Sequence, residues 1–186
     1  NSEKAALDRW KALKARWDIE ASDQEFVSQL RQLQNERDQL RDLPAVRQRR
    51  YQQLERDREK VQRQRFLERF EIEKAKISGI GPSRTVMLAS YNIETAWDVA
   101  EHRIMNVPGF GPALTRELMA WRRGVESRFR FDPSKGVDPQ DIAALDRELA
   151  GVKGKLEQNL AAGAQRLTEI RNRTLARRAA LQPQLE

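Results

Sequence analysis

Two stretches of this sequence share the pattern G-x-G-P and start 30 residues apart. Residues 77–86 are I-S-G-I-G-P-S-R-T-V, and residues 107–116 are V-P-G-F-G-P-A-L-T-R. A helix that ends on the first glycine of the pattern can use the left-handed conformation, which glycine adopts at little cost. Proline suits the first turn of a new helix, where its missing N–H has no partner anyway. Each stretch therefore predicts two helices joined by a very tight hairpin.

The segments on either side indicate long helices. Charged residues make up 34% of the 186 residues and aromatic residues 6%, so we expect an elongated molecule with a modest core. Residues 2–43 contain no Gly or Pro and repeat apolar residues at steps of three, four and seven. Ser22-x-x-Glu25 could cap a fresh helix start there. Pro44 predicts a turn near residues 43–45, after which a second helix from residue 45 to about 76 folds back on the first.

This interpretation makes residues 1–65 a helical hairpin arm. In that register Leu33 faces Leu54, and Trp17 faces Phe70. Residues 125–139 are rich in Pro, Gly and Asp and predict a loop. Asp138 and Pro139 then predict an N-cap and first position for a long helix over residues 140–186. That helix has a coiled-coil seam, which can pack on the arm or on a second copy of the chain.

The paired stretches resemble the tandem helix-hairpin-helix domain of DNA repair and recombination proteins, over about residues 66–124. The expected fold class is therefore all-α, with a long antiparallel coiled-coil-like stalk and a tandem helix-hairpin-helix head. The resemblance implies that hairpin amides hold phosphates on both strands of duplex DNA, across a minor groove and without reading sequence. The residues that it implies for phosphate binding are Gly79, Ile80, Gly81, Ser83, Arg84, Gly109, Phe110, Gly111 and Arg116. The second copy has Ala113 and Leu114 where the first has Ser83 and Arg84, so we expect it to serve mainly the fold.

A narrower resemblance covers most of the chain. The two hairpins, the run L-A-S-Y-N-I-E-T-A-W-D-V and the loop F-R-F-D-P-S-K-G-V-D-P are similar to the C-terminal region of bacterial Ser/Thr-kinase-like proteins linked with tellurium-resistance and stress-response systems. The chain itself has no H-R-D or D-F-G motif, and it begins with Asn1 rather than Met. The resemblance thus implies a covalently linked kinase-like domain outside this chain.

The charge distribution favours an anionic partner. The net charge is +7, and residues 44–124 hold 16 Lys/Arg against 10 Asp/Glu. We expect a non-enzymatic, sequence-independent DNA-binding module, the targeting or sensing region of a larger signalling protein. The alternative is a protein–protein scaffold or dimerisation module in which the stalk binds, as a homodimer or with another protein, and the head is structural. The basic run from Arg47 to Arg65 is interpreted as a solvated helix face.

Several classes of site are not expected. With no Cys and one His, the chain offers no metal set or Ser/His relay, so we expect no metal, cofactor or catalytic residue. No apolar run approaches a membrane span, which predicts a soluble protein with no membrane partner, by default cytoplasmic. Asp132 follows Gly111 at about the distance that base-excision glycosylases use for a catalytic Asp. The Lys that lyase-active members place after the hairpin is missing, so Asp132 is interpreted as a turn or cap.

Overall fold

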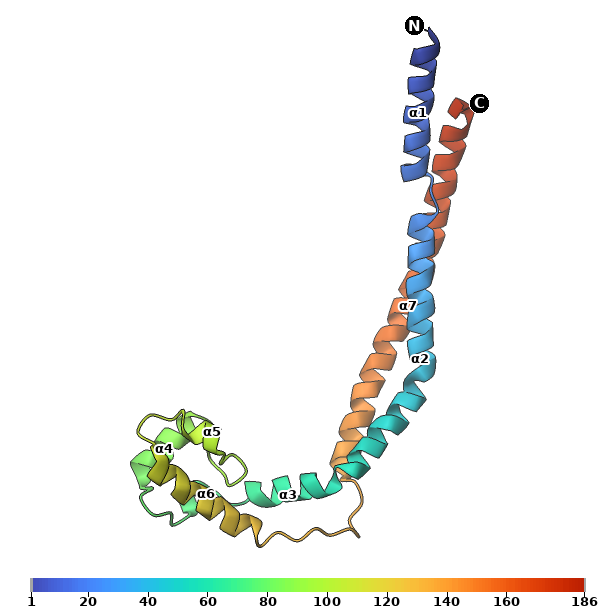
Figure 1. Ribbon diagram of the computed structural model, residues 1–186. Coiled ribbons are helices and arrows are strands. Elements are labelled where there is room, and N and C mark those ends of the chain that lie inside the picture. The colour runs from blue at the N-terminus through green and yellow to red at the C-terminus, as the bar shows by residue number, and fades with distance from the viewer. Residues whose placement is uncertain (1, 186) are drawn as a thin grey trace. The chain divides into compact units, whose positions relative to one another are not determined.

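The computed structural model describes residues 2–185 and consists of helices, with no strand among those residues (Figure 1). The helices are α1 (Ser2–Glu20), α2 (Gln24–Arg56), α3 (Arg58–Glu68), the 3₁₀ helix η1 (Ile72–Lys74), α4 (Pro82–Ser90), α5 (Glu101–Ile104), α6 (Pro112–Glu126) and α7 (Pro139–Leu185). The prediction of an all-α fold is confirmed. No helix in this described range is apolar enough over a sufficient length to span a membrane.

The chain divides into two compact units. The arm unit takes in the chain up to Arg50 and again from Ile142 onward. The central unit is Tyr51–Asp141 and contains both G-x-G-P stretches.

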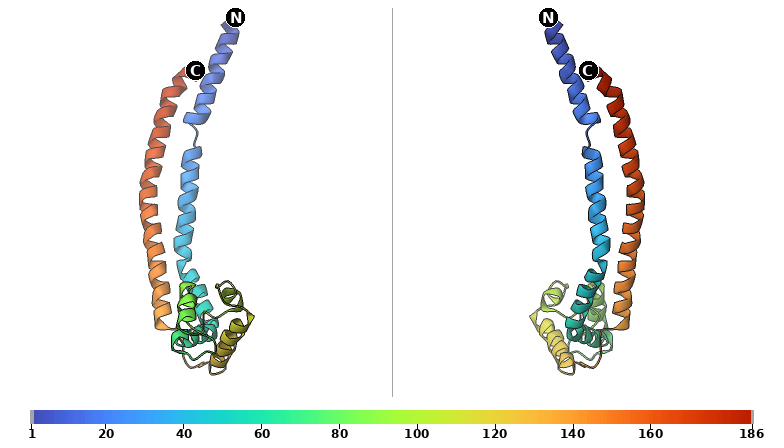
Figure 2. Two further views of the ribbon diagram at one scale, coloured as in Figure 1. Left: turned by 90° about the vertical axis from the view of Figure 1, so that its left-hand side faces the viewer. Right: turned by 90° about the vertical axis from the view of Figure 1, so that its right-hand side faces the viewer.

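In the arm unit, α2 and α7 run side by side in opposite directions (Figure 2). Leu33 of α2 packs directly against Gly163 of α7. A Cβ atom on Gly163 would lie 2.1 Å from Leu33 Cδ2, far inside van der Waals contact. The missing side chain therefore admits Leu33, which is 8% exposed, into the seam. Further buried residues of α7 repeat along the same face: Leu145, Leu156, Ile170 and Leu181.

Ion pairs fix the register of α2 against α7. Arg47 Nε lies 2.7 Å from Asp146 Oδ1, and Arg173 Nη2 lies 2.6 Å from Glu25 Oε1. Both pairs are largely exposed, so they specify alignment more than they stabilise the arm. Arg50 adds a bidentate pair with Glu148.

The predicted turn near residues 43–45 is wrong. Helix α2 runs through Pro44 without ending, so residues 1–65 do not form a hairpin, and Leu33 packs on α7 rather than facing Leu54. An internal proline removes one helical hydrogen bond and typically costs about 3 kcal/mol. Contacts with α7 on both sides of Pro44 offset that cost: Leu33 lies before the proline and Arg47 after it.

The restart suggested by Ser22-x-x-Glu25 is present. Helix α1 ends at Glu20 and α2 begins at Gln24. Ala21 between them is fully buried, and its carbonyl accepts a 2.8 Å hydrogen bond from Arg178 Nε of α7. The break is thus held by the same helix that pairs with α2.

The central unit has two apolar clusters. The larger one unites both G-x-G-P stretches and consists of Ile72, Ile77, Leu88, Ile93, Val99, Ile104, Val107, Phe110 and Leu118. The smaller one consists of Leu67, Ala96 and Val125. Trp121 packs against both clusters and so joins them.

The helix predicted to reach residue 76 ends earlier. Helix α3 stops at Glu68, and the chain leaves the helix to pair with the segment after α4. Ile72 N–H donates to Glu94 O at 2.8 Å, and Ala96 N–H donates to Phe70 O at 2.9 Å. The first G-x-G-P turn is therefore preceded by the short η1 rather than by a long helix.

The start of α7 follows the predicted cap. Asp138 Oδ1 accepts a hydrogen bond from Gln140 N–H at 2.7 Å, and Pro139 is the first helical residue. Arg65 of α3 forms ion pairs with Asp138 and Asp141, which tie the loop before α7 to α3. Because the Asp138 cap and Pro139 are local features, the sequence alone suffices to place the start of α7.

We predict opposite effects of alanine at two glycines of α7. Gly151→Ala meets no atom within 4 Å and should stabilise the helix by about 0.5–1 kcal/mol. Gly163→Ala should be less stable than Gly151→Ala by about 1–3 kcal/mol, because it must displace Leu33. Urea unfolding followed by circular dichroism measures both. Equal effects of the two substitutions would contradict the α2–α7 packing.

We also predict an acid-sensitive arm. Hydrogen bonds from Arg47 and Arg50 lower the pKa of Asp146 and of Glu148 below their ordinary values. The folded state thus holds these protons more weakly than the unfolded chain, so the stabilisation is present at neutral pH and is lost as pH falls through the lowered pKa values. The variant Asp146→Asn/Glu148→Gln should lose less thermal stability than the wild type on acidification. An identical loss in both proteins would exclude a contribution from these pairs.

Candidate functional site

The two G-x-G-P turns have the same backbone conformation. Gly79 has φ +77° and Gly109 has φ +82°, in the left-handed region that favours glycine. The second glycine of each turn is extended and caps the following helix. Gly81 has φ −94° and ψ −177°, and Gly111 has φ −98° and ψ −173°. The sequence repeat is therefore a structural repeat.

The hydrogen bonds of the turns also match. Bonds present in both copies are Ile80 N–H to Ile77 O (3.1 Å), Phe110 N–H to Val107 O (3.2 Å), Thr85 Oγ1 to Gly81 O (3.1 Å) and Thr115 Oγ1 to Gly111 O (2.9 Å). The threonines were missed in the sequence analysis, although the extended pattern G-P-x-x-T marks both of them. Each threonine fixes the start of the helix that follows its turn.

The starts of α4 and α6 are open to a ligand. Their N-caps, Gly81 and Gly111, carry no capping side chain, and no atom lies within 4 Å of a Cβ built on either. The first amides of a helix have no partner within the helix and carry partial positive charge, which suits an anion. In the first copy these amides belong to Ser83 and Arg84, and in the second to Ala113 and Leu114.

Two of the predicted site residues serve the turn itself. The amides of Ile80 and Phe110 are already bonded within their turns. The Phe110 side chain is 6% exposed and lies in the larger apolar cluster, and Ile80 packs against that cluster. The predicted residues that remain exposed are Gly79, Gly81, Ser83, Arg84, Gly109, Gly111 and Arg116.

The two copies interlock at Gly79. A Cβ on this glycine would lie 2.8 Å from Leu114 Cδ2, so the helix start of the second copy packs against the turn of the first. Leu114 is thus used for packing, as the sequence suggested for the second copy. In the first copy Arg84 Nη1 donates to Gly79 O at 2.7 Å, and the Arg84 side chain stays exposed at the helix start.

Helix α6 adds two exposed arginines beside the second turn. Neither Arg116 nor Arg123 has an ion-pair partner among residues 2–185. They border a hollow of about 320 Å³ that also includes Pro112 and Thr115 of the turn. Arg123 was not predicted, because its seven-residue spacing from Arg116 along α6 has meaning only once the helix is known.

The positive charge is less concentrated than the sequence suggested. The central unit holds 16 Lys/Arg and 14 Asp/Glu, a net charge of +2. Arg47, Arg49 and Arg50 belong to the arm unit, and each forms an ion pair there. The basic run is therefore partly neutralised rather than simply solvated.

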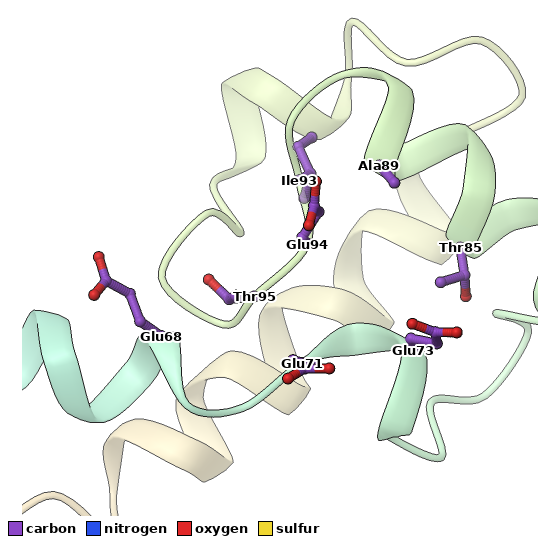
Figure 3. Close-up of a pocket in the computed structure, with 8 residues that line it drawn as sticks. All are labelled: Glu68, Glu71, Glu73, Thr85, Ala89, Ile93, Glu94 and Thr95. Carbon is purple, nitrogen blue, oxygen red and sulfur yellow. The ribbon is translucent and has the colours of Figure 1, made fainter.

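An acidic hollow of about 250 Å³ lies beside α4 (Figure 3). The residues that line it are Glu68, Glu71, Glu73, Thr85, Ala89, Ile93, Glu94 and Thr95. Lys74 bonds to Glu71, which raises the pKa of Lys74. No cluster of three residues suited to a metal ion exists within residues 2–185. An anion must therefore approach α4 at its start and not along the side that bears Thr85 and Ala89.

Asp132 lies in a loop that is tied to α3. Its carboxylate accepts hydrogen bonds from the Ser134 amide (3.0 Å) and hydroxyl (2.5 Å), and the Ser134 hydroxyl lowers the pKa of Asp132. Its amide donates to Gln62 Oε1 at 2.9 Å. These bonds are those of a turn residue.

We predict a graded response to alanine in the turns. Gly79→Ala combines a left-handed φ with a clash against Leu114, so it should destabilise the protein most. Gly109→Ala has only the strained φ and should cost about 1–2 kcal/mol. Gly111→Ala has neither and should be nearly neutral. Denaturant unfolding followed by tryptophan fluorescence tests this order, and equal costs at Gly109 and Gly111 would contradict it.

The comparisons with known proteins give one relationship. No protein-family model matches the chain, and no solved structure matches it. Protein kinase YegI of Escherichia coli O157:H7 is 35% identical over 152 residues, which cover 82% of this chain and 24% of the relative. Its counterpart in Escherichia coli strain K12 is 34% identical over the same length. The chain is homologous to part of protein kinase YegI.

This homology confirms that the chain is related to a bacterial kinase-like protein. The chain spans about a quarter of the length of the relatives that it matches, so their name describes proteins much longer than this chain.

Proposed function

We propose that the central unit binds the phosphate backbone of nucleic acid through the two G-x-G-P turns, as a tandem helix-hairpin-helix module. The observation that supports this proposal is the repeated turn geometry, with two helix starts that carry no capping side chain. Backbone amides bind phosphate whatever the base sequence, so the module is sequence-independent. Two equivalent contacts suit duplex DNA, which offers phosphates on two strands.

The two contacts are unequal in this proposal. The first turn supplies the amides of Ser83 and Arg84 together with the Arg84 guanidinium. The second turn supplies the amides at the start of α6, while its cationic groups, Arg116 and Arg123, lie farther along the helix. Because the central unit has a net charge of only +2, binding depends on these local contacts rather than on a strong overall field.

The module forms the targeting or sensing region of a larger, cytoplasmic kinase-like signalling protein of bacteria, with a role in stress response. Homology that covers most of this chain but about a quarter of the relatives supports the larger protein. The kinase-like activity belongs to residues outside this chain, which contributes binding and no catalytic residue of its own.

A second candidate function is protein–protein scaffolding or dimerisation through the arm. An apolar hollow of about 390 Å³ between α2 and α7 favours it. The hollow lies at Pro44. Its lining consists of Leu40, Leu43, Leu149 and Ala150, with the charged Arg47, Asp146, Lys153 and Glu157. Under this candidate the turns are purely structural.

Fluorescence anisotropy with a random-sequence DNA duplex at two salt concentrations tests the proposal. If two phosphates are neutralised, log K should fall with log salt with a slope of about −2. The variant Gly81→Asp/Gly111→Asp should bind at least about tenfold more weakly, because each carboxylate caps its own helix and repels phosphate.

The matched control is Gly81→Ala/Gly111→Ala, which fits the space and adds no charge. This control should bind as the wild type does. Binding that ignores salt, or aspartate variants that bind normally, would rule out the turns as the phosphate site. Absence of DNA binding together with a dimer in sedimentation would favour the scaffold.

A further inference from the structure

A cluster of arginine and phenylalanine side chains lies in the central unit, on residues that the turns do not use. The Phe66 and Phe70 rings are 5.1 Å apart between centroids. The guanidinium carbon of Arg69 lies 5.3 Å from the Phe66 centroid, and that of Arg128 lies 4.7 Å from the Phe70 centroid. We call these four residues the Arg–Phe patch.

Tertiary packing places the two arginines on neighbouring rings. Arg69 follows α3, and Arg128 follows α6. Phe129, next to Arg128, stacks on Phe66 at 5.6 Å and so fastens the loop after α6 to α3. Phe66 and Phe70 in turn pack against the smaller apolar cluster. The rings are therefore fixed, and each holds a guanidinium group at its face.

The hydrogen-bond donors of these two guanidinium groups are unused among residues 2–185. Both side chains are exposed, and neither donates a hydrogen bond or forms an ion pair with any of residues 2–185. Arg122 shows the contrasting case. It stacks on Trp97, but it also donates to backbone carbonyls and pairs with Glu126 at 3.0 Å, so its donors serve the fold.

We propose that Arg69 and Arg128 form a binding site for a phosphorylated side chain on a protein segment. A guanidinium is a planar fork whose N–H groups bind phosphate oxygens in pairs. Two guanidinium groups match the charge of a phosphomonoester, which is between −1.5 and −2 at neutral pH. Stacking on the rings orients both forks before the ligand arrives, which lowers the entropy lost on binding.

The surroundings favour a phosphorylated protein over a nucleic-acid strand. Bases bind single-strand sites by stacking on free aromatic faces, whereas here the arginines cover Phe66 and Phe70. Glu68 and Glu71 flank the patch in the chain and line the acidic hollow beside α4 (Figure 3). The next phosphates of a strand would meet these carboxylates. A peptide with Lys or Arg beside its phosphorylated residue would place positive charge there instead.

The test uses the full chain and a labelled ten-residue peptide with one phosphoserine flanked by lysines. The controls are the unphosphorylated peptide and a 20-nucleotide single-stranded DNA. Anisotropy should show that phosphorylation tightens peptide binding at least about tenfold, since hydrogen bonds between charged groups are about twice as strong as neutral ones. Arg69→Gln/Arg128→Gln should abolish this preference. Arg69→Lys/Arg128→Lys keeps the charge but not the fork, and should lose most of it.

The matched control variant is Lys60→Gln/Lys76→Gln, which removes the same charge from exposed positions of the same unit and should leave peptide binding unchanged. Circular dichroism confirms that each variant is folded. Equal binding of the two peptides, or a phosphate preference that survives the glutamine substitutions at Arg69 and Arg128, would overturn the proposal. So would loss of DNA binding in the patch variants without loss of phosphopeptide binding. The DNA experiment on Gly81 and Gly111 has its own outcome and does not affect this one.

Discussion

The central unit depends on two chain reversals that only glycine makes at low cost. At Gly79 and Gly109 the backbone enters the left-handed region, which lets a buried residue two positions earlier and the helix that follows share one core. Leu88 of α4 and Leu118 of α6, both fully buried, occupy equivalent places in the two copies. A side chain at either glycine would strain the turn and move the helix that it starts.

The repeat is close in backbone conformation but unequal in side chains. Leu114 packs against Gly79, so the start of α6 contributes to the packing of the first turn. Arg84 occupies the position in the first copy that corresponds to Leu114, and it remains exposed. A module that holds phosphate mainly through its first copy and stabilises itself through its second is consistent with this arrangement.

The arginines of this chain have three different roles, which its total charge conceals. Arg47 and Arg50 align α2 with α7 through ion pairs. Arg122 is enclosed by carbonyl groups and Glu126 and holds the central unit together. Arg69 and Arg128 are held on phenylalanine rings with their donors unused within residues 2–185. Arginines of this third kind are available to an anionic partner, as are the exposed Arg116 and Arg123 of α6.

Local features of the sequence determined much of this protein. The two tight turns, the Asp138 cap of α7 and the all-α class each follow from local features of the sequence. Glycine and proline restrict φ whatever surrounds them, and a capping side chain reaches only its own first turn. The site was predicted less fully. The amides of Ile80 and Phe110, two of the nine predicted site residues, are already bonded within these turns.

Tertiary structure alone decided which segments meet. Apolar stripes of similar period can pair in several registers, so the sequence favoured a hairpin at Pro44, whereas the fit of Leu33 against Gly163 selects α7 as the partner of α2. The same holds for Leu114 on Gly79 and for the approach of Arg128 to Phe70. These contacts join residues far apart in the chain, and they are chosen by the total packing and pairing energy of the alternatives, which no short stretch of sequence contains.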